Sequence, residues 1–195
     1  LFRSPRLDEE ALSSLQEASA PPQRLITVGE GDAAIEVGQE TVLYRHEEKF
    51  HHPCGVAVRV QDTLDDAALD ERLSNINELA FERLGRTIEV DVVAVENASG
   101  DSAKFTACAE KAAEKTGKAL ILISEDADSL KAAGSALKTK RPLLHYCGDE
   151  GGLEAAIAAA KQLELPLGLQ NDSLEDLADM AEAARQAGVQ DLVIS

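Results

Sequence analysis

The sequence EVDVVAVENASGDSAKFTACAEKAAEKTGKALILIS (Glu89–Ser124) contains an apolar strand, an amphipathic helix and a second apolar strand, and this order repeats up to Ser195. Short apolar runs bounded by polar residues or glycine are typical of buried parallel strands. Five such runs predict strands: Val90–Val95, Ala119–Ile123, Pro142–His145, Leu165–Leu169 and Asp191–Ile194. Their starts recur every 23 to 29 residues. This is the length of one βα unit, so we expect an α/β fold with a parallel sheet.

The segments between these strands have helical periodicity. Apolar residues spaced i, i+3, i+4, i+7 occur in two of them: Phe105, Cys108, Ala109 and Ala112, and Leu153, Ala156, Ile157 and Ala160. Each helix can therefore bury one stripe against the sheet. Ser173, with Asp176 three residues later, predicts a helix N-cap, and Gly117 and Gly188 stand where helices should end.

The segment before Glu89 predicts a linker and a first part of the same domain. Residues 7–18 have helical spacing and lead to Pro21-Pro22, so we assign residues 1–22 to a linker helix and a Pro-Pro segment, and residues 23–195 to the domain. Short apolar runs flank a glycine-rich turn in Leu25–Val28 and Ala33–Val37, which predicts a β-hairpin. Thr41–Arg45 then reads as a first barrel strand.

Two further elements precede the repeat. The alternation in Cys54–Val60 predicts another strand, outside the counted series, and Asp65–Leu84 predicts an acidic helix. Counting Thr41–Arg45 with the five later strands gives six of the eight strands of a TIM-type (β/α) barrel. An open six-stranded sheet is the alternative, but no GxGxxG or P-loop follows any strand. We therefore predict an incomplete barrel preceded by a β-hairpin.

Composition excludes several classes of function. The formal net charge is −17, which disfavours nucleic acid and anionic membranes as partners, since both attract basic surfaces. The three cysteines (Cys54, Cys108 and Cys147) form no CxxC pair, so neither a disulfide framework nor a zinc knuckle is indicated. No apolar run is long enough to span a bilayer and no signal peptide is recognisable, so we expect a cytoplasmic protein.

Polar residues follow several strands, at the edge of the sheet where parallel α/β folds bind ligands. The candidate cofactor-contacting residues on this face are His46, Asn97, Asp149 and Asn171. The alternative explanation is that such residues end strands and cap the following helices. We assign none of them a catalytic role.

Two other groups were considered for chemistry. His46, His51, His52 and Cys54 could supply metal ligands, but they form no HExxH or comparable spacing, so no metal site is predicted. His145 and Cys147 alternate on one strand and should share a face, yet a nucleophile pair also needs an oxyanion hole and an orienting group. Cys108 is expected to be a small core residue.

Several stretches, in the same order along the chain, resemble the large (gamma) subunit of the corrinoid iron–sulfur protein of the acetyl-CoA decarbonylase/synthase (CO dehydrogenase/acetyl-CoA synthase) system. They are Glu17–Pro22, Gly38–Glu47 with Phe50 and Pro53 after it, Asp91–Asn97 with Ser99-Gly100-Asp101, and Leu122–Asp126. The resemblance implies a three-part subunit with an N-terminal [4Fe-4S] domain, a central TIM barrel and a C-terminal corrinoid (cobalamin) domain. This chain matches the linker, the hairpin and most of the barrel.

The resemblance also implies a role in the reductive acetyl-CoA pathway. In the family the cobalt accepts a methyl group from a methyl-pterin methyltransferase and delivers it to acetyl-CoA synthase, while the cluster restores oxidised cobalt. The implied partner is a small (delta) subunit that is also a TIM barrel. Ser4-Pro5 stands where the family has a Cys-Pro pair that supplies the last cluster ligand. The resemblance implies corrinoid and a [4Fe-4S] cluster in the full-length protein, but serine is a poor replacement for a thiolate on iron, so Ser4 puts the cluster in doubt.

Three hypotheses therefore remain at this point. The chain is a scaffold barrel of a methyl-carrier subunit that itself holds no cofactor, a pterin-dependent methyltransferase barrel acting through Asn97, Asp149 and Asn171, or a structural interaction module without cofactors. In the first and third, this part of the protein alone is not catalytic.

Overall fold

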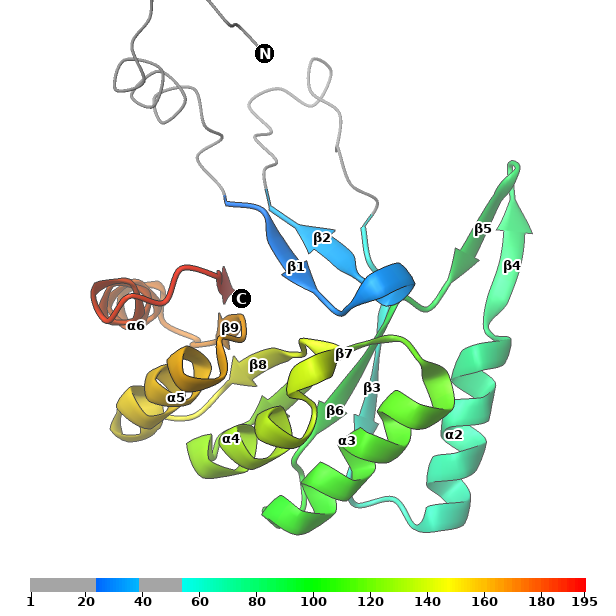
Figure 1. Ribbon diagram of the computed structural model, residues 1–195, viewed down its shortest axis with the longest axis horizontal. Coiled ribbons are helices and arrows are strands. Elements are labelled where there is room, and N and C mark those ends of the chain that lie inside the picture. The colour runs from blue at the N-terminus through cyan, green and yellow to red at the C-terminus, as the bar shows by residue number, and fades with distance from the viewer. Residues whose placement is uncertain (1–23, 39–53) are drawn as a thin grey trace, which may run out of the picture. The chain divides into compact units, whose positions relative to one another are not determined.

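The computed structural model describes residues 24–38 and 54–195. Nearly all of them belong to one compact unit, Ile26–Val37 with Cys54–Ser195. Its centre is a six-stranded parallel sheet in the order β10-β9-β8-β7-β6-β3 (Figure 1). The strands are β3 (Ala57–Gln61), β6 (Val92–Glu96), β7 (Ala119–Ser124), β8 (Leu143–Tyr146), β9 (Leu167–Leu169) and β10 (Leu192–Ile194).

Five helices connect or precede these strands: α2 (Asp66–Glu78), α3 (Ser102–Thr116), α4 (Ala127–Ala136), α5 (Glu150–Leu163) and α6 (Leu174–Gln186). The parallel sheet and the helices confirm the α/β fold predicted from the repeat. The predicted strand Thr41–Arg45 lies outside the described residues. The place beside β6 is held by β3, which overlaps the predicted strand Cys54–Val60.

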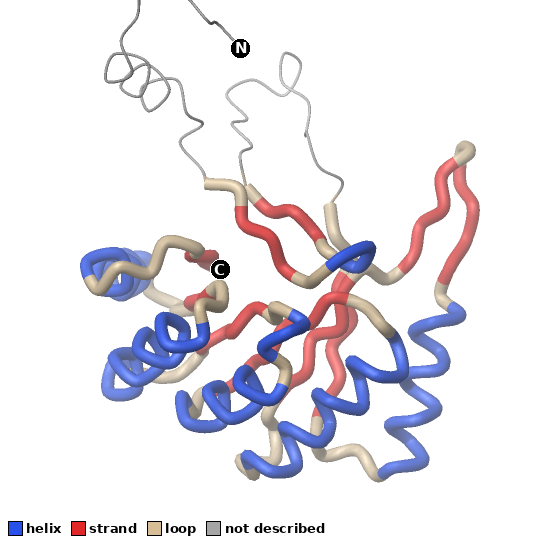
Figure 2. The backbone as a smooth tube through the Cα atoms, in the orientation of Figure 1, coloured by secondary structure: helices blue, strands red, loops and turns tan. Residues whose placement is uncertain are grey.

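All five helices pack on one face of the sheet, where they form a row along it (Figure 2). Alternate strand residues point to this face and form the main core, for example Val93, Val95, Leu120, Leu122, Leu144 and Tyr146. A doubly wound sheet carries helices on both faces, whereas a barrel wall carries them on the outside only. The one-sided arrangement of the described helices is therefore compatible with part of a barrel.

The two predicted helical stripes are confirmed. Phe105 and Ala109 of α3, and Ala156 and Ala160 of α5, are all buried. The predicted N-cap Ser173 accepts a hydrogen bond from the Asp176 backbone N–H at 3.3 Å. Gly117 ends α3 in the left-handed conformation, with φ of 64°.

The opposite face of the sheet is covered at the strand starts by β1 (Ile26–Val28) and β2 (Ile35–Val37), which pair antiparallel. A short 3₁₀ helix (Gly31–Ala33) joins them. Ile26 and Val28 pack against Val92, Ala119 and Leu143 in a second apolar cluster.

Arg141 links this antiparallel pair to the sheet. Its Nε donates to the Thr27 carbonyl at 3.0 Å, and its Nη1 donates to the Glu164 carbonyl at 3.2 Å. Its Nη2 forms an ion pair with Asp191 Oδ2 at 2.7 Å. A 3₁₀ helix (Lys138–Lys140) leads into Arg141, which has a left-handed backbone with φ of 45°. One side chain thus joins three segments near the strand starts.

The predicted helix Asp65–Leu84 is too long. The helix α2 ends at Glu78, and the chain continues as a two-stranded antiparallel ribbon, β4 (Ala80–Arg83) and β5 (Arg86–Glu89). Leu84 and Gly85 form its turn with φ of 51° and 75°. Only the first part of the predicted helix has a buried stripe, made by Leu69, Leu73 and Ile76. No described helix is long and apolar enough to cross a membrane.

Candidate polar cleft at the carboxyl ends of the strands

The loops after β6, β7 and β8 border a cleft of about 440 Å³. Polar and apolar groups share its lining: Glu96, Asn97, Ala98, Gly100, Ile123, Ser124, Glu125, Asp126 and Cys147. Three parallel strands end together here, because the register aligns Glu96 with Ile123 and Ser124 with Tyr146. The structure therefore places a cleft at the edge of the sheet where the sequence predicted a ligand face.

Asn97 is the predicted site residue that lies in this cleft. Its Nδ2 donates to Ser124 Oγ at 3.0 Å, and its backbone N–H donates to the Ile123 carbonyl at 2.9 Å. Its Oδ1 is buried and accepts no hydrogen bond. An unpaired buried amide oxygen costs free energy, so this atom would be stabilised by any donor that reached it.

Ser124 is only 2% exposed. Besides the bond from Asn97, its Oγ accepts from the Asp126 backbone N–H at 3.0 Å. Asp126 caps α4, and hydrogen bonds to the Ser129 hydroxyl and backbone lower the pKa of its carboxyl. The floor of the cleft is thus fixed by the start of a helix.

Asp62 holds one wall of the cleft. Asp62 is 7% exposed, although it was not among the predicted site residues. Oδ1 accepts from the backbone N–H groups of Ala98 and Ser99 at 2.9 and 2.8 Å, and Oδ2 accepts from the Ser99 hydroxyl at 2.6 Å. These bonds attach the loop after β6 to the end of β3.

Glu96 carries further polar contacts on the sheet face away from the helices. Its Oε2 accepts from Gln61 Nε2 at 2.8 Å, and its Oε1 pairs with Arg59 Nη1 at 3.4 Å. The Glu96 side chain is 25% exposed and that of Arg59 is 64% exposed, so the pair is open to solvent. Such a pair orients side chains more than it stabilises the fold.

His145 belongs to β8, and Cys147 directly follows the end of this strand. Burial, with the nearby carboxylates of Glu125 and Glu96, raises the pKa of the Cys147 thiol. A thiol with a raised pKa stays protonated at neutral pH and is a poor nucleophile. His145 Nε2 lies 3.1 Å from Gln170 Oε1. The geometry therefore gives no support to a Cys–His nucleophile.

The other predicted site residues lie elsewhere. Asp149 caps α5 by accepting from the Gly152 N–H at 3.3 Å. Asn171 Oδ1 accepts from the Ser173 N–H at 2.9 Å, and its Nδ2 contacts Met180 Sδ at 3.7 Å. Neither is among the residues that line the cleft. His46 and the proposed histidine-rich metal ligands lie outside the described residues, except for the exposed Cys54.

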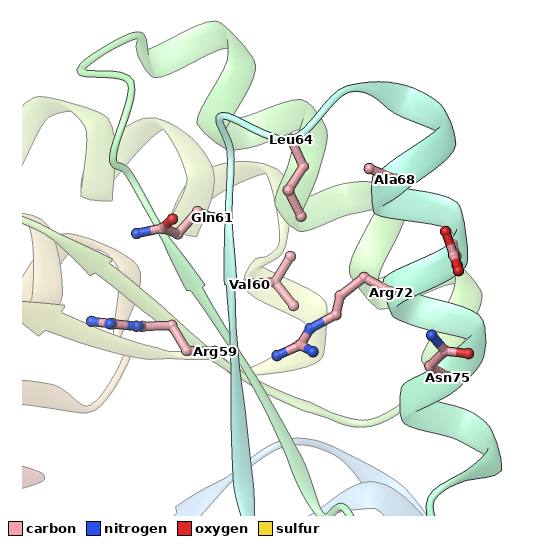
Figure 3. Close-up of a pocket in the computed structure, with 8 residues that line it drawn as sticks. Arg59, Val60, Gln61, Leu64, Ala68, Arg72 and Asn75 are labelled. Atoms are coloured by element: carbon pink, nitrogen blue, oxygen red, sulfur yellow. The ribbon is translucent and has the colours of Figure 1, made fainter.

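A second hollow of about 560 Å³ lies between β3 and α2 (Figure 3). In Figure 3, Arg72 extends from the helix toward the strand, and Val60 points to the helix while Arg59 and Gln61 project from the other side. This side of β3 pairs with no described strand. The hollow is therefore a surface groove beside an open sheet edge.

Asn97 and Ser124 are joined by a hydrogen bond of 3.0 Å, so the two polar side chains hold each other in place beside the cleft. Within residues 24–38 and 54–195, no group of three or more His, Cys, Asp or Glu side chains could hold a metal ion. Sequence reasoning missed Asp62, Arg59 and Gln61. The register of β3 with β6, which brings them to the site, cannot be read from local spacing.

Comparison with known families identifies a match over residues 25–195 to a family described as the CO dehydrogenase/acetyl-CoA synthase delta subunit. The large subunit of the corrinoid/iron-sulfur protein of Moorella thermoacetica is 33% identical over 190 residues, which is 97% of this chain and 42% of that protein. The gamma subunits of the acetyl-CoA decarbonylase/synthase complex of Methanopyrus kandleri and Archaeoglobus fulgidus are each 34% identical over 93% and 95% of this chain.

The chain spans about two fifths of the length of these relatives, 42% of the first and 39% of the other two. The family description names a delta subunit, whereas the individual relatives are named large or gamma subunits. The resemblance predicted from the sequence is therefore confirmed.

Proposed function

The chain belongs to the family of the CO dehydrogenase/acetyl-CoA synthase delta subunit, and from this membership we propose that it is the scaffold barrel of a corrinoid iron–sulfur methyl-carrier subunit. The observation that carries the proposal is the similarity to corrinoid/iron-sulfur and gamma subunits over more than nine tenths of the chain. In this role the chain supports methyl transfer from a methyl-pterin, through cobalamin, to acetyl-CoA synthase.

The proposed architecture is a TIM-type barrel of which the described sheet is the wall formed by six strands. Two observations support it: the strands follow chain order across the sheet, and the described helices lie on one face. The antiparallel pair β1–β2 would then close the barrel at the strand starts, where Ile26 and Val28 already pack on the sheet. The domain boundary at residues 22–23 is part of this proposal.

The cysteines of the chain do not fit the iron–sulfur cluster of the family. A [4Fe-4S] cluster needs four thiolates, whereas Cys54 is exposed, Cys108 is buried and Cys147 lines the polar cleft. No described cluster of side chains offers metal ligands. We therefore propose that corrinoid and cluster are held by other parts of the full-length protein, with the cluster in doubt because of Ser4, which lies outside the described residues.

The proposed partners are a small (delta) corrinoid protein subunit, forming a heterodimer, together with the methyl-pterin methyltransferase and acetyl-CoA synthase. The relatives' names mark them as subunits of a complex. A cytoplasmic location and the absence of nucleic acid and membrane partners complete the proposal, supported by the net charge of −17.

The test is the cobalt and iron content of the full-length gene product, with an anaerobic absorption spectrum, after co-expression with the small subunit. Cobalt with about four irons per protein supports the complete methyl-carrier reading. Cobalt without iron means a carrier that depends on an outside reductant, as Ser4 suggests. The absence of both metals from a well-folded complex would overturn the proposal in favour of a structural module.

One observation favours a second candidate, a pterin-dependent methyltransferase barrel. The unpaired Asn97 Oδ1 in the cleft could accept a hydrogen bond from a pterin ring N–H. Isothermal titration with methyl-tetrahydrofolate tests this reading. Saturable binding that Asn97→Ala removes and Asn75→Ala leaves unchanged would support it, since Asn75 lines the separate groove beside α2. Absence of binding would eliminate it.

A further inference from the structure

The ribbon formed by β4 and β5 extends away from the helices and the sheet (Figure 1). Every residue of β4 is exposed. Two-stranded ribbons are marginally stable in water unless a hydrophobic face packs against something else. The ribbon therefore needs an explanation that the scaffold role does not provide.

The two faces of the ribbon differ in chemistry. Phe81 pairs directly with Ile88, so these side chains share one face, and Arg83 lies on the same face because side chains alternate along a strand. The opposite face carries Glu82 and Glu89. One face is thus apolar and basic, whereas the other is acidic.

The apolar side chains of this ribbon are unusually open to solvent. Phe81 is 59% exposed and Ile88 is 37% exposed, and Leu84 at the tip is 97% exposed. Together with Leu79, these residues make up four of the nine exposed large hydrophobic side chains in the described part of the chain. Concentrated exposure of this kind marks a protein interaction site, whereas scattered exposed side chains do not.

Charge narrows the choice of partner. Arg83 has no ion-pair partner among the described residues, although the chain as a whole carries a net charge of −17. An aromatic side chain beside an arginine is the composition favoured at the centre of protein interfaces. A partner surface with an apolar groove and carboxylates at its rim would bury Phe81 and Leu84 and neutralise Arg83.

We propose that this face of the β4–β5 ribbon (Phe81, Arg83, Leu84 and Ile88) is the arm by which the chain binds an acidic, apolar-lined groove of the small (delta) subunit of its complex. The proposal depends on the proposed function in one respect: both take the chain to be one subunit of a complex that contains a small (delta) subunit. It needs no cofactor, so metal content and subunit binding can succeed or fail independently.

The test measures binding of the full-length protein to the small (delta) subunit by titration calorimetry and sedimentation. Leu84→Ser and Arg83→Glu should each weaken binding about tenfold or more, and higher NaCl should weaken the wild type more than the Arg83→Glu variant. Leu174→Ser removes another largely exposed leucine, from α6, and Glu82→Gln alters the other face of the ribbon. Both controls should bind like the wild type.

Several outcomes would overturn the proposal. The proposal is wrong if both Leu84→Ser and Arg83→Glu bind the small (delta) subunit with unchanged affinity. Arg83→Glu is included because Leu84→Ser could disturb the turn between β4 and β5. Loss of self-association instead of subunit binding would show that the occupant is a second copy. Hydrogen-exchange protection of Phe81–Ile88 in the full-length protein alone would show that the chain covers its own ribbon.

Discussion

Replacement of Asp62 by alanine tests whether its buried carboxylate holds the cleft loop. The substitution removes three hydrogen bonds of 2.9, 2.8 and 2.6 Å from Ala98 and Ser99. Hydrogen bonds to a charged group contribute about 1.5–3 kcal/mol each. The loop residues are exposed, so water can replace some of the lost hydrogen bonds. We therefore expect the free energy of unfolding to fall by about 3 kcal/mol. For a chain of this size that corresponds to a decrease in Tm of about 6–12 °C.

Asp62→Asn gives an intermediate case, because the amide oxygen can still accept from both backbone N–H groups. We expect it to cost about 1 kcal/mol. Thermal melts followed by circular dichroism measure both values, and hydrogen exchange at Ala98 and Ser99 reports the loop directly. Glu71→Gln removes one exposed negative charge and is the control. A difference of 1 °C in Tm corresponds to about 0.4 kcal/mol. If Asp62→Ala melts within 1 °C of the control and the exchange rates of the Ala98 and Ser99 amides do not change, the Asp62 hydrogen bonds do not anchor the loop.

Three further predictions concern other parts of the chain. Arg141→Met removes three hydrogen bonds and should lower the free energy of unfolding by about 2 kcal/mol in urea titrations. Burial raises the pKa of the Cys108 thiol to about 11. Above pH 9 the unfolded chain therefore loses this proton more readily than the folded chain, and the free energy of unfolding falls. Cys108→Ala should reduce this fall. At pH 8 a thiol reagent should label Cys54 in the folded protein and Cys108 only after unfolding. Gly152→Ala would place a Cβ 2.2 Å from Tyr146 Oη and should cost about 2 kcal/mol, less in a Tyr146→Phe background.

Each of these has a contradicting result. Equal urea midpoints for wild type and Arg141→Met would show that the guanidinium does not join the three segments. Rapid labelling of Cys108 in the folded protein would contradict its burial among the α3 core residues. Additive effects of the Gly152 and Tyr146 substitutions would show that the ring does not limit the space at this glycine.

The parts of the fold predicted from the sequence were those specified by local periodicity. Phe105 and Ala156 recur with helical spacing in their segments and are buried as expected, because one face of each helix must contact the sheet. The strand order could not be read in this way. The alternating pattern identified Val58 and Val60 as strand residues, but only pairing with β6 shows that β3 begins the described sheet.

The β4–β5 ribbon was missed for a specific reason. Ala80 continues the helical spacing of Leu73 and Ile76, and the following residues have good helix propensity, so the pattern gave no end for the helix. The available signal was Gly85 before the β-branched residues Thr87 and Ile88. Leu84 in the left-handed conformation hides this turn, since leucine rarely adopts it.

The sequence indicated where along the sheet a candidate site would lie, but it did not show which polar residues reach the cleft. Asn97 follows β6 and reaches the cleft because strand ends meet there. Asp149 and Asn171 also follow strands, yet their side chains serve backbone N–H groups of the next helix or turn. Spacing alone does not distinguish these two uses of a short polar side chain. The Asp62 network depends on contacts across more than thirty residues, which no local pattern contains.

From β6 to β10, the strand order has a consequence for synthesis of the chain. Each strand from β7 to β10 pairs with the strand made just before it, so every new βα unit finds a finished edge on which to dock. Pairing between consecutive units spans only one βα unit, which keeps the contact order lower than pairing between distant strands would. During translation the N-terminal part of a chain is available for folding before the rest has been made. We expect this sheet to grow on the ribosome one strand at a time, with the newest strand always forming its open edge.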